Sequence, residues 1–219
     1  MSDKRKIMEY SILNDKKEGV AMDIVTNDEY IGDSRLAEWY FKSRDGYELD
    51  SFSLGYFLKD LGDFVVVKTI DLNGALDTVT AFLKSDILEI RYETAYTDML
   101  NSYIEQNMES NLYDPYHLMN QWDIFNANTI QQVLLNCFEA EKVISVCILE
   151  GEYVEHGKIV LLTDNVMTLN ESEYLADLNE HENCNTTIRI SKTTEINFLS
   201  KNNHLYEQYL LKKPESNNK

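Results

Sequence analysis

Two stretches of the sequence, GYFLKDLGDFVVV at residues 55–67 and GKIVLLTDNVMTL at residues 157–169, share one pattern. Each has a glycine eight residues before an Asp or Asn, and a short apolar run follows that residue at once. Short runs of this kind, separated by a polar turn, predict a strand, a turn and a second strand. The two stretches lie 102 residues apart, so we expect an internal repeat.

The repeat extends toward the C-terminus of each copy. Residues 89–92 (EIRY) have their counterpart in residues 195–198 (EINF), 106 residues later, and both predict a strand. The same offset relates residues 99–104 to 205–210, in which apolar side chains recur at helical spacing. The larger offset places about four additional residues in the middle loop of the second copy, over 171–185.

Each copy is also expected to begin with a helix and a strand. The helices are predicted over residues 6–17 and 129–142, and Asn128 is the expected cap of the second helix. The strands are predicted over residues 20–25 and 143–148. The order of elements is then the same in both copies, which favours a repeat over chance similarity.

These elements predict an α+β fold that is mainly β, with two tandem small barrels that each have a preceding and a following helix. Asp114-Pro115 marks a break between the copies. The expected divisions are residues 1–108 for the first copy with an insertion at about 29–50, 109–127 for a connecting segment, 128–213 for the second copy, and 214–219 for a disordered tail.

A helix followed by about five short, bent strands resembles the Sm-like architecture, a small barrel of the SH3 type. The most specific stretch is in the second copy. There Gly157, the pair Asp164-Asn165 and the hydrophobic pair Val166-Met167 resemble the first Sm signature. The resemblance covers about 80 residues of each half. It implies the barrel fold and makes RNA binding one function to consider.

Two signature positions depart from the Sm-like pattern. Thr168 stands where Sm-like RNA binders have an asparagine that contacts a base, and the first copy has Val67 or a neighbour there. The second signature normally has an Arg-Gly or Lys-Gly turn, whereas residues 84–86 and 191–193 contain no glycine. The resemblance therefore implies the barrel without the usual RNA-contacting residues.

The chain carries 38 acidic and 20 basic side chains, a formal net charge of −18. Such a surface repels nucleic acid, whose sequence-independent binding depends on Lys and Arg at the phosphates. Anionic membranes are disfavoured for the same reason, and no stretch has the roughly 18–20 apolar residues of a spanning helix. Cys137, Cys147 and Cys184 lack metal-ligand spacing. We expect a cytoplasmic protein without cofactor, for which RNA is a more plausible nucleic acid than DNA.

No catalytic or metal motif stands out. Residues 151–158 (GEYVEHGK) superficially resemble a phosphate loop, but five residues separate the glycines and Ile159 stands where Ser or Thr should bind magnesium. Residues 180–184 (EHENC) gather potential ligands, yet a zinc site needs about four from a rigid frame. We assign no catalytic and no metal-binding residues and expect a protein that is not an enzyme. An enzyme whose site assembles only in space remains an alternative.

Aromatic residues are the candidates for contact with a partner. Trp39, Tyr40 and Phe41 stand together in the insertion, where we expect a loop or a short helix. Trp122 and Phe125 lie in the connecting segment. These side chains either pack on the barrels or bind a protein partner, because aromatic residues are enriched in binding hot spots.

The function that we expect is a non-catalytic binding module that acts through protein–protein contacts of its acidic surface. A basic protein partner would be attracted by that charge, and exposed edge strands favour homo-oligomers. The alternative is an RNA-binding regulator of Sm-like type. It requires that basic and aromatic side chains converge on one rim, and the candidates are Lys59, Lys68, Lys84, Arg91 and Tyr92, with Tyr56 as a further aromatic residue.

Overall fold

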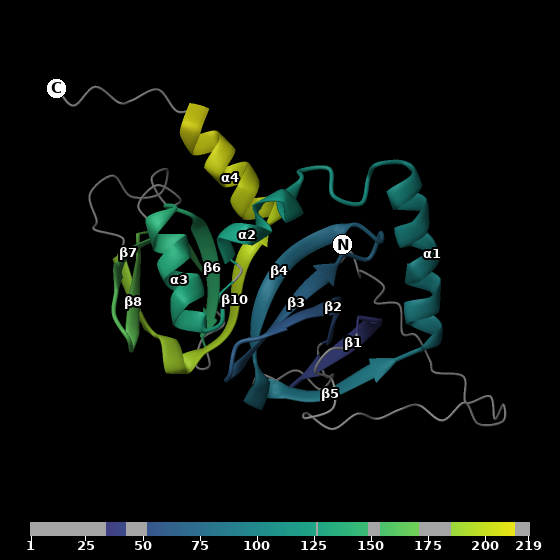
Figure 1. Cartoon of the computed structure of the whole chain (residues 1–219), viewed down its shortest axis with the longest axis horizontal. Helices are drawn as coiled ribbons and strands as arrows, with labels where there is room; N and C mark the ends of the chain where they lie inside the picture. The colour runs from purple at the N-terminus through teal and green to yellow at the C-terminus, as the bar shows by residue number, and fades with distance from the viewer. Residues whose placement is uncertain (1–33, 43–51, 126, 149–153, 171–184, 213–219) are drawn as a thin grey trace, which may run out of the picture.

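The computed structural model describes residues 34–42, 52–125, 127–148, 154–170 and 185–212. These residues form one ten-stranded antiparallel sheet with the order β5-β1-β2-β3-β4-β10-β6-β7-β8-β9 (Figure 1). The strands of the first half are β1 (Leu36–Phe41), β2 (Phe52–Asp60), β3 (Phe64–Ile70), β4 (Leu76–Leu83) and β5 (Ile87–Tyr92). Those of the second half are β6 (Val143–Ile148), β7 (Val154–Leu162), β8 (Val166–Asn170), β9 (Asn185–Arg189) and β10 (Thr193–Ser200).

Four α-helices and three short 3-10 helices accompany the sheet in the described part of the chain. Figure 1 shows α3 against the second half, α1 at the outer side of the first half, and α4 continuing from β10. Their bounds are α1 (Ala95–Glu109), α2 (Trp122–Phe125), α3 (Ile130–Glu139), α4 (Lys201–Lys212), η1 (Lys84–Asp86), η2 (Leu118–Gln121) and η3 (Ile190–Lys192).

The two halves have the same strand order, β5-β1-β2-β3-β4 and β10-β6-β7-β8-β9. Their pairing registers also agree in detail. Val66 pairs with Ala81 across β3 and β4, and Thr168 pairs with Thr187 across β8 and β9. The first members of these pairs are 102 residues apart and the second members 106, so strand pairing follows the offsets seen in the sequence.

Among the described residues, the first strand of the first half is β1, where no strand was predicted. Residues 20–25, and the helix predicted over 6–17, lie outside the described residues. The strand that pairs with both β2 and β5 is β1, which lies inside the expected insertion and contains Trp39, Tyr40 and Phe41. The loop or short helix expected there was wrong, because aromatic residues favour a strand whose neighbours cover them.

The predicted class, α+β and mainly β, is confirmed. Among the described residues, neither half closes on itself through backbone pairing, and the sheet is open. The edge of β4 pairs with β10 from the other half. One strand edge presents a single row of N–H and C=O groups, so β4 cannot use that edge for a strand of its own half as well.

The largest hydrophobic core contains side chains from both halves. Phe64, Val66 and Val79 from β3 and β4 pack into it, and each is at most 3% exposed. The second half contributes β6 to β10, η3 and α3, and the segment between the halves contributes α2 with Phe125. Burial of apolar surface by both halves together stabilises the junction at roughly 25 cal/mol per Å².

The described helices α1, α3 and α4 lie where helical spacing was predicted, and one cap was predicted wrongly. α3 falls within the helix predicted over 129–142, and it begins after Thr129, whose hydroxyl accepts a hydrogen bond from the backbone N–H of Gln132. The prediction of Asn128 as the cap was therefore wrong by one residue. α1 begins after Thr94 in a capping box with Thr97. Residues 214–219 lie outside the described residues.

Candidate binding site at the seam of the sheet

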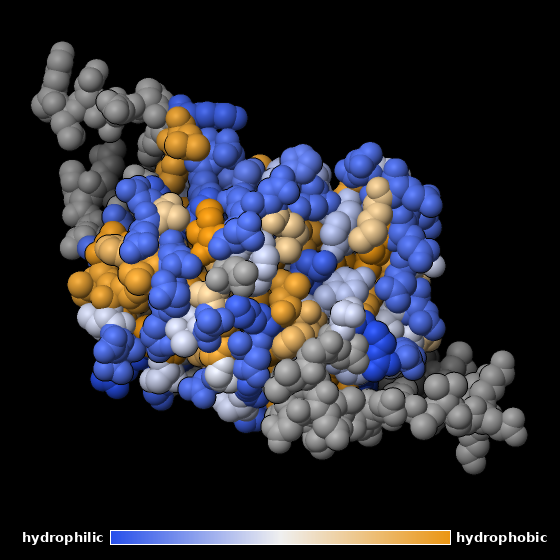
Figure 2. Space-filling model, in the orientation of Figure 1, coloured by the Kyte–Doolittle hydropathy of each residue, from blue (hydrophilic) through white to orange (hydrophobic). Residues whose placement is uncertain are grey.

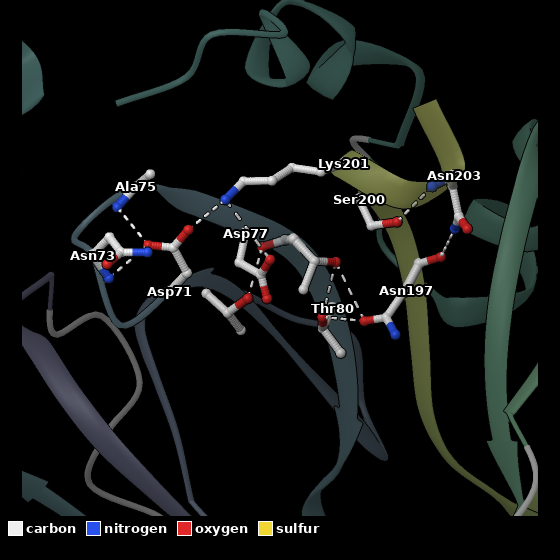
Figure 3. Close-up of polar contacts among 11 residues, drawn as sticks. Asp71, Asn73, Ala75, Asp77, Thr80, Asn197, Ser200, Lys201 and Asn203 are labelled. Carbon is white, nitrogen blue, oxygen red and sulfur yellow. Dashed lines mark hydrogen bonds and ion pairs between the residues drawn. The ribbon is translucent and has the colours of Figure 1, made fainter. Parts of the chain in front are cut away.

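The junction of the two halves, which we call the seam, is the pairing of β4 with β10. Thr80 lies opposite Asn197 and Ala81 lies opposite Ile196. The Oδ1 atom of Asn197 accepts hydrogen bonds from the Thr80 hydroxyl at 2.5 Å and the Thr78 hydroxyl at 3.3 Å (Figure 3). Thr80 is 0% exposed. The hydrogen bond from this buried hydroxyl to the half-buried Asn197 favours the observed register of the seam, because a one-residue slip would separate the hydroxyl from its acceptor.

A charged cluster lies at the end of the seam, where β10 passes into α4. The Lys201 ammonium lies 2.5 Å from Asp71 Oδ2 and 4.0 Å from Asp77 Oδ1. Asp71 Oδ1 also accepts hydrogen bonds from the backbone N–H groups of Asn73 and Ala75, each at 2.9 Å (Figure 3). The ion pair therefore ties the turn after β3 to the start of α4.

The two aspartates of this cluster have opposite pKa shifts. Burial acts to raise the pKa of Asp71, but the Lys201 hydrogen bond and the two backbone donors outweigh it and hold that pKa below its usual range. Burial raises the pKa of Asp77; Lys201 opposes this and the nearby Asp71 charge adds to it. An additional cation would therefore stabilise the charged form of Asp77 more than that of Asp71, which Lys201 and two backbone donors already stabilise.

A pocket of about 520 Å³ opens beside the seam. Asp71, Asp77 and Glu195 supply carboxylates, Thr78 and Thr80 supply hydroxyls, and aromatic and aliphatic side chains form apolar walls. The lining residues are Phe52, Ser53, Leu54, Thr69, Ile70, Asp71, Leu72, Asp77, Thr78, Thr80, Phe82, Glu195 and Asn197. Lys201 contacts two of these carboxylates, those of Asp71 and Asp77. The pocket suits a cationic group with an apolar stem.

A second polar cluster joins β6, β7 and α4. The Ser145 hydroxyl lies 2.7 Å from His156 Nδ1 and donates to Asn203 Oδ1 at 2.9 Å. Burial lowers the pKa of His156, although Asn203 and Glu155 oppose this. A serine and a histidine thus meet in space, as the sequence left open. Ser145 is only 3% exposed and its contacts lie within the fold, so the cluster positions α4.

The predicted partner-binding aromatics of β1 pack within the first half. Trp39 is 0% exposed, and its Nε1–H donates to the carbonyl of Gly55 at 3.2 Å. Phe41 is 8% exposed and its ring centroid lies 4.5 Å from that of Phe82. Tyr40 is half-buried; burial, followed by its hydrogen bond to Glu38, raises its pKa to about 12.

The aromatics of the connecting segment pack against the large core. Phe125 is 1% exposed and stacks on Phe198 with centroids 6.0 Å apart. Trp122 is partly buried against the same core. Of the five predicted aromatics, Tyr40 and Trp122 keep surface that a partner could contact.

The basic side chains of the predicted RNA rim lie on different elements and have partners within the chain. Lys84, in η1, contacts Asp60 at 2.7 Å. Lys68, on β3, lies 4.9 Å from the centroid of the Tyr56 ring and 5.6 Å from that of Tyr113. Burial lowers the pKa of Lys68, so its charge is costly where it stands.

The remaining rim residues lie on β5 and β2. Arg91 contacts Glu89 at 2.6 Å, and its guanidinium lies 4.3 Å from the centroid of the Tyr40 ring. Tyr92 is 3% exposed and buried in the core beneath β1. Lys59 lies on β2. The structure brings Arg91 together with Tyr40, and it does not gather the five rim residues into one cationic surface.

On the face that Figure 2 shows, hydrophobic side chains gather at the end of the molecule formed by β7 and β8. On β7, Val160 is 45% and Leu161 is 52% exposed.

In the part of the chain that the structure describes, no three potential ligand side chains come together to hold a metal. No helix in that part combines the length and hydrophobicity needed to cross a bilayer. The candidate metal ligands at 180–184 lie outside the described residues.

Comparison with protein-family models, with curated proteins and with solved structures gives no significant match.

Sequence reasoning missed the residues that make the seam. Asn197 and Thr80 gave one signal, since each is a polar residue inside an apolar strand. Asp71 and Lys201 gave none, because 130 residues separate them in the chain. Only the pairing of β4 with β10, which no local pattern specifies, places them together.

Proposed function

We propose that this protein is a cytoplasmic, non-catalytic binding module that acts through protein–protein contacts, and that its seam pocket receives a basic side chain of a protein partner. The observation that carries the proposal is the pocket itself. Its carboxylates come from both halves, since Asp71 and Asp77 flank the turn between β3 and β4 while Glu195 lies on β10. The site depends on the seam.

Charge and shape support a cationic partner. The net charge of −18 attracts basic proteins over distances of about a Debye length, roughly 8 Å at physiological salt. Inside the pocket, Phe52 is 42% exposed and lies on the wall, where an aliphatic stem or a guanidinium plane can contact its ring. Lysine and arginine combine such a stem with a positive charge.

For the fold, we propose that each half is a variant of the small Sm-like barrel. The repeated strand order and the sequence resemblance around Gly157 support this. The strong curvature of the sheet in the first half (Figure 1) is consistent with it. The hydrogen-bonded edge that would close the first half is used in the seam instead.

The test is a calorimetric titration of the whole chain with a short peptide of alternating lysine and valine, at low and moderate salt. Asp77→Asn and Glu195→Gln should each weaken binding several-fold, because each removes one charge of the pocket and keeps an acceptor oxygen. Glu105→Gln on α1 is the matched control, since it changes the net charge equally at an exposed helix position. Equal losses in all three variants would contradict the pocket.

A parallel titration with poly(U) RNA tests the alternative function. The proposal expects no binding, because the Lys68, Lys84 and Arg91 side chains contact groups of the chain itself. Salt-sensitive binding of the RNA would favour an RNA-binding regulator of Sm-like type instead.

A further inference from the structure

We propose that Lys68 is a site of covalent modification, at which the side-chain amine reacts with an acyl donor of the acyl phosphate class. The residue lies on β3, and its half-buried side chain lies against two tyrosine rings. Lys68 and these rings do not line the seam pocket, so the inference stands independently of the proposed function.

The rings of Tyr56 and Tyr113 form the surroundings of the Lys68 amine. Nζ lies 4.9 Å from the centroid of the first ring and 5.6 Å from that of the second. Tyr56 is the residue of β2 that pairs with Lys68. The backbone carbonyl of Tyr113 accepts a hydrogen bond from the N–H of Leu76 at 2.7 Å. Both rings pack against the core beneath α1, so the walls of the site are held by the fold.

Lys68 makes no ion pair with a carboxylate of the described residues. Its contacts there are the two rings, and the carboxylate whose charge acts on it is that of Asp114. The oxygens of Asp114 accept hydrogen bonds from the backbone N–H groups of Leu118 at 2.8 Å and Met119 at 3.0 Å. Four other lysines do have a carboxylate oxygen within 3.5 Å, namely Lys84, Lys142, Lys158 and Lys201.

The surroundings favour the neutral amine. Burial lowers the pKa of Lys68, and the charge of Asp114 opposes this shift without cancelling it. Burial raises the pKa of Tyr56 and of Tyr113, so both phenols are neutral at physiological pH. The phenol oxygen of Tyr113 is buried and has no hydrogen-bond partner within the described chain. Asp114 is therefore the charged group that faces Lys68, and the other two titratable groups are uncharged.

A neutral amine is a nucleophile, because its nitrogen has a free electron pair that the ammonium ion lacks. In the proposed step, Nζ of Lys68 attacks the carbonyl carbon of the acyl phosphate and a C–N bond forms. The bond from that carbon to the phosphate oxygen breaks, and phosphate leaves with the electron pair. The proton released by the nitrogen passes to water. The acyl donor is the one co-reactant that this step requires.

The product changes the charge where the connecting segment meets the first half. An amide at Lys68 is neutral, so the cation–π contacts with the rings and the attraction to Asp114 are lost. Asp114 belongs to the connecting segment and holds the start of η2 through its two backbone hydrogen bonds. Acylation therefore acts on the contact between that segment and β3.

Acetylation of the whole chain by acetyl phosphate near neutral pH, followed by quantitative peptide mass spectrometry, tests the site. Lys84 is the internal control, because it is also half-buried but its Nζ lies 2.7 Å from both carboxylate oxygens of Asp60. Lys68 should be acetylated at least several-fold faster than Lys84, and Lys68→Arg should abolish its product. Equal rates, or a faster reaction at Lys84, would overturn the proposal.

The pH profile of the reaction tests the cause. The rate of an amine rises about tenfold per pH unit and levels near its pKa, which for lysine is ordinarily about 10.4. For Lys68 the rate should level at a lower pH. Tyr113→Ala removes one wall and should move that point up toward the ordinary value, whereas Tyr113→Phe keeps the ring and should leave it unchanged.

The natural chain and Tyr113→Phe decide the outcome even if Tyr113→Ala does not fold, which circular dichroism would show. Levelling of the Lys68 rate at or above the ordinary lysine value in both would overturn the proposal. So would the same shift in Tyr113→Phe as in a folded Tyr113→Ala, because the ring, and not the hydroxyl, is the group that excludes water from the amine.

Discussion

Truncation of Phe198 to alanine is expected to destabilise both halves of the protein together. Phe198 lies on β10 in the large core, is 2% exposed and stacks on Phe125. The same core contains Val66 and Val79 from the first half, so loss of the ring leaves a cavity that both halves line. The two halves should therefore unfold as one cooperative unit, and the substitution should lower the free energy of unfolding of both halves by the same amount.

The expected magnitude follows from the burial. Phe→Ala substitutions in well-packed cores cost about 3–5 kcal/mol. With an m value of about 3 kcal/mol/M, near the upper end for small proteins, the urea midpoint should fall by about 1–1.7 M. Phe138→Ala on α3 is the control, because that side chain is 39% exposed and its loss should cost about 1 kcal/mol or less.

The assay uses tryptophan fluorescence from the first half. The chain contains two tryptophans, so Trp122→Phe leaves Trp39, which is buried in the core beneath β1, as the reporter. In that background, Phe198→Ala should lower the midpoint that Trp39 reports by the full amount. An unchanged Trp39 transition, alongside a lowered circular-dichroism transition, would show that the halves unfold separately and would refute the reasoning.

Three further outcomes are expected. Gly55→Ala and Gly157→Ala should each destabilise the fold strongly, because an added Cβ would lie 2.5 Å from Val67 Cγ1 in the first and 2.4 Å from the Asn170 carbonyl oxygen in the second. Gly62 has open space around the position of an added Cβ, but its φ is +85°. Gly62→Ala should therefore lower the free energy of unfolding, measured in urea, by only about 1–2 kcal/mol. Burial lowers the pKa of His156 in the folded protein, so on acidification the unfolded chain binds this proton before the folded chain does. The neutral, buried His156 therefore contributes to the free energy of unfolding above about pH 6.5, and this contribution is lost as the pH falls toward the lowered pKa of the folded state. In a plot of unfolding free energy against pH, His156→Gln should reduce the slope below about pH 6.5. An unaltered slope would contradict a lowered pKa of His156. Burial raises the pKa of the Cys137 thiol, and Cys147 is also buried, so a Cys184→Ser chain should react with a thiol reagent only on unfolding. Fast reaction of the native chain would contradict this.

Local pattern predicted most of the second half. The apolar stripe that includes Ile130 and Val133 predicted α3, and the paired runs around Asn165 predicted β7 and β8. These elements are encoded by side-chain periodicity over a few residues, so they can be read without knowing what they contact.

The strand β1 was not predicted, for a physical reason. The run of Trp39, Tyr40 and Phe41 is too short for periodicity alone to distinguish a strand from a short helix. The choice of β1 is made by its pairing on both sides, with β2 and with β5. Trp39 is a core residue for the same reason.

The seam was beyond sequence reasoning because it joins β4 to β10 across more than a hundred residues. Nothing in the local sequence of Thr80 or Asn197 specifies the other as its neighbour. The candidate site shares this property, since its carboxylates lie on both sides of the seam.

The most direct test of this account is an engineered disulfide across the seam. Thr80→Cys and Asn197→Cys, in a chain without its natural cysteines, place two thiols on facing residues of β4 and β10. Facing Cα atoms of antiparallel strands lie about 4.5–5.5 Å apart, within the range that a disulfide spans. The account predicts a disulfide within one chain, seen as a faster-migrating monomer without reductant. Free thiols after oxidation of the folded chain, or cross-links only between chains, would contradict the seam.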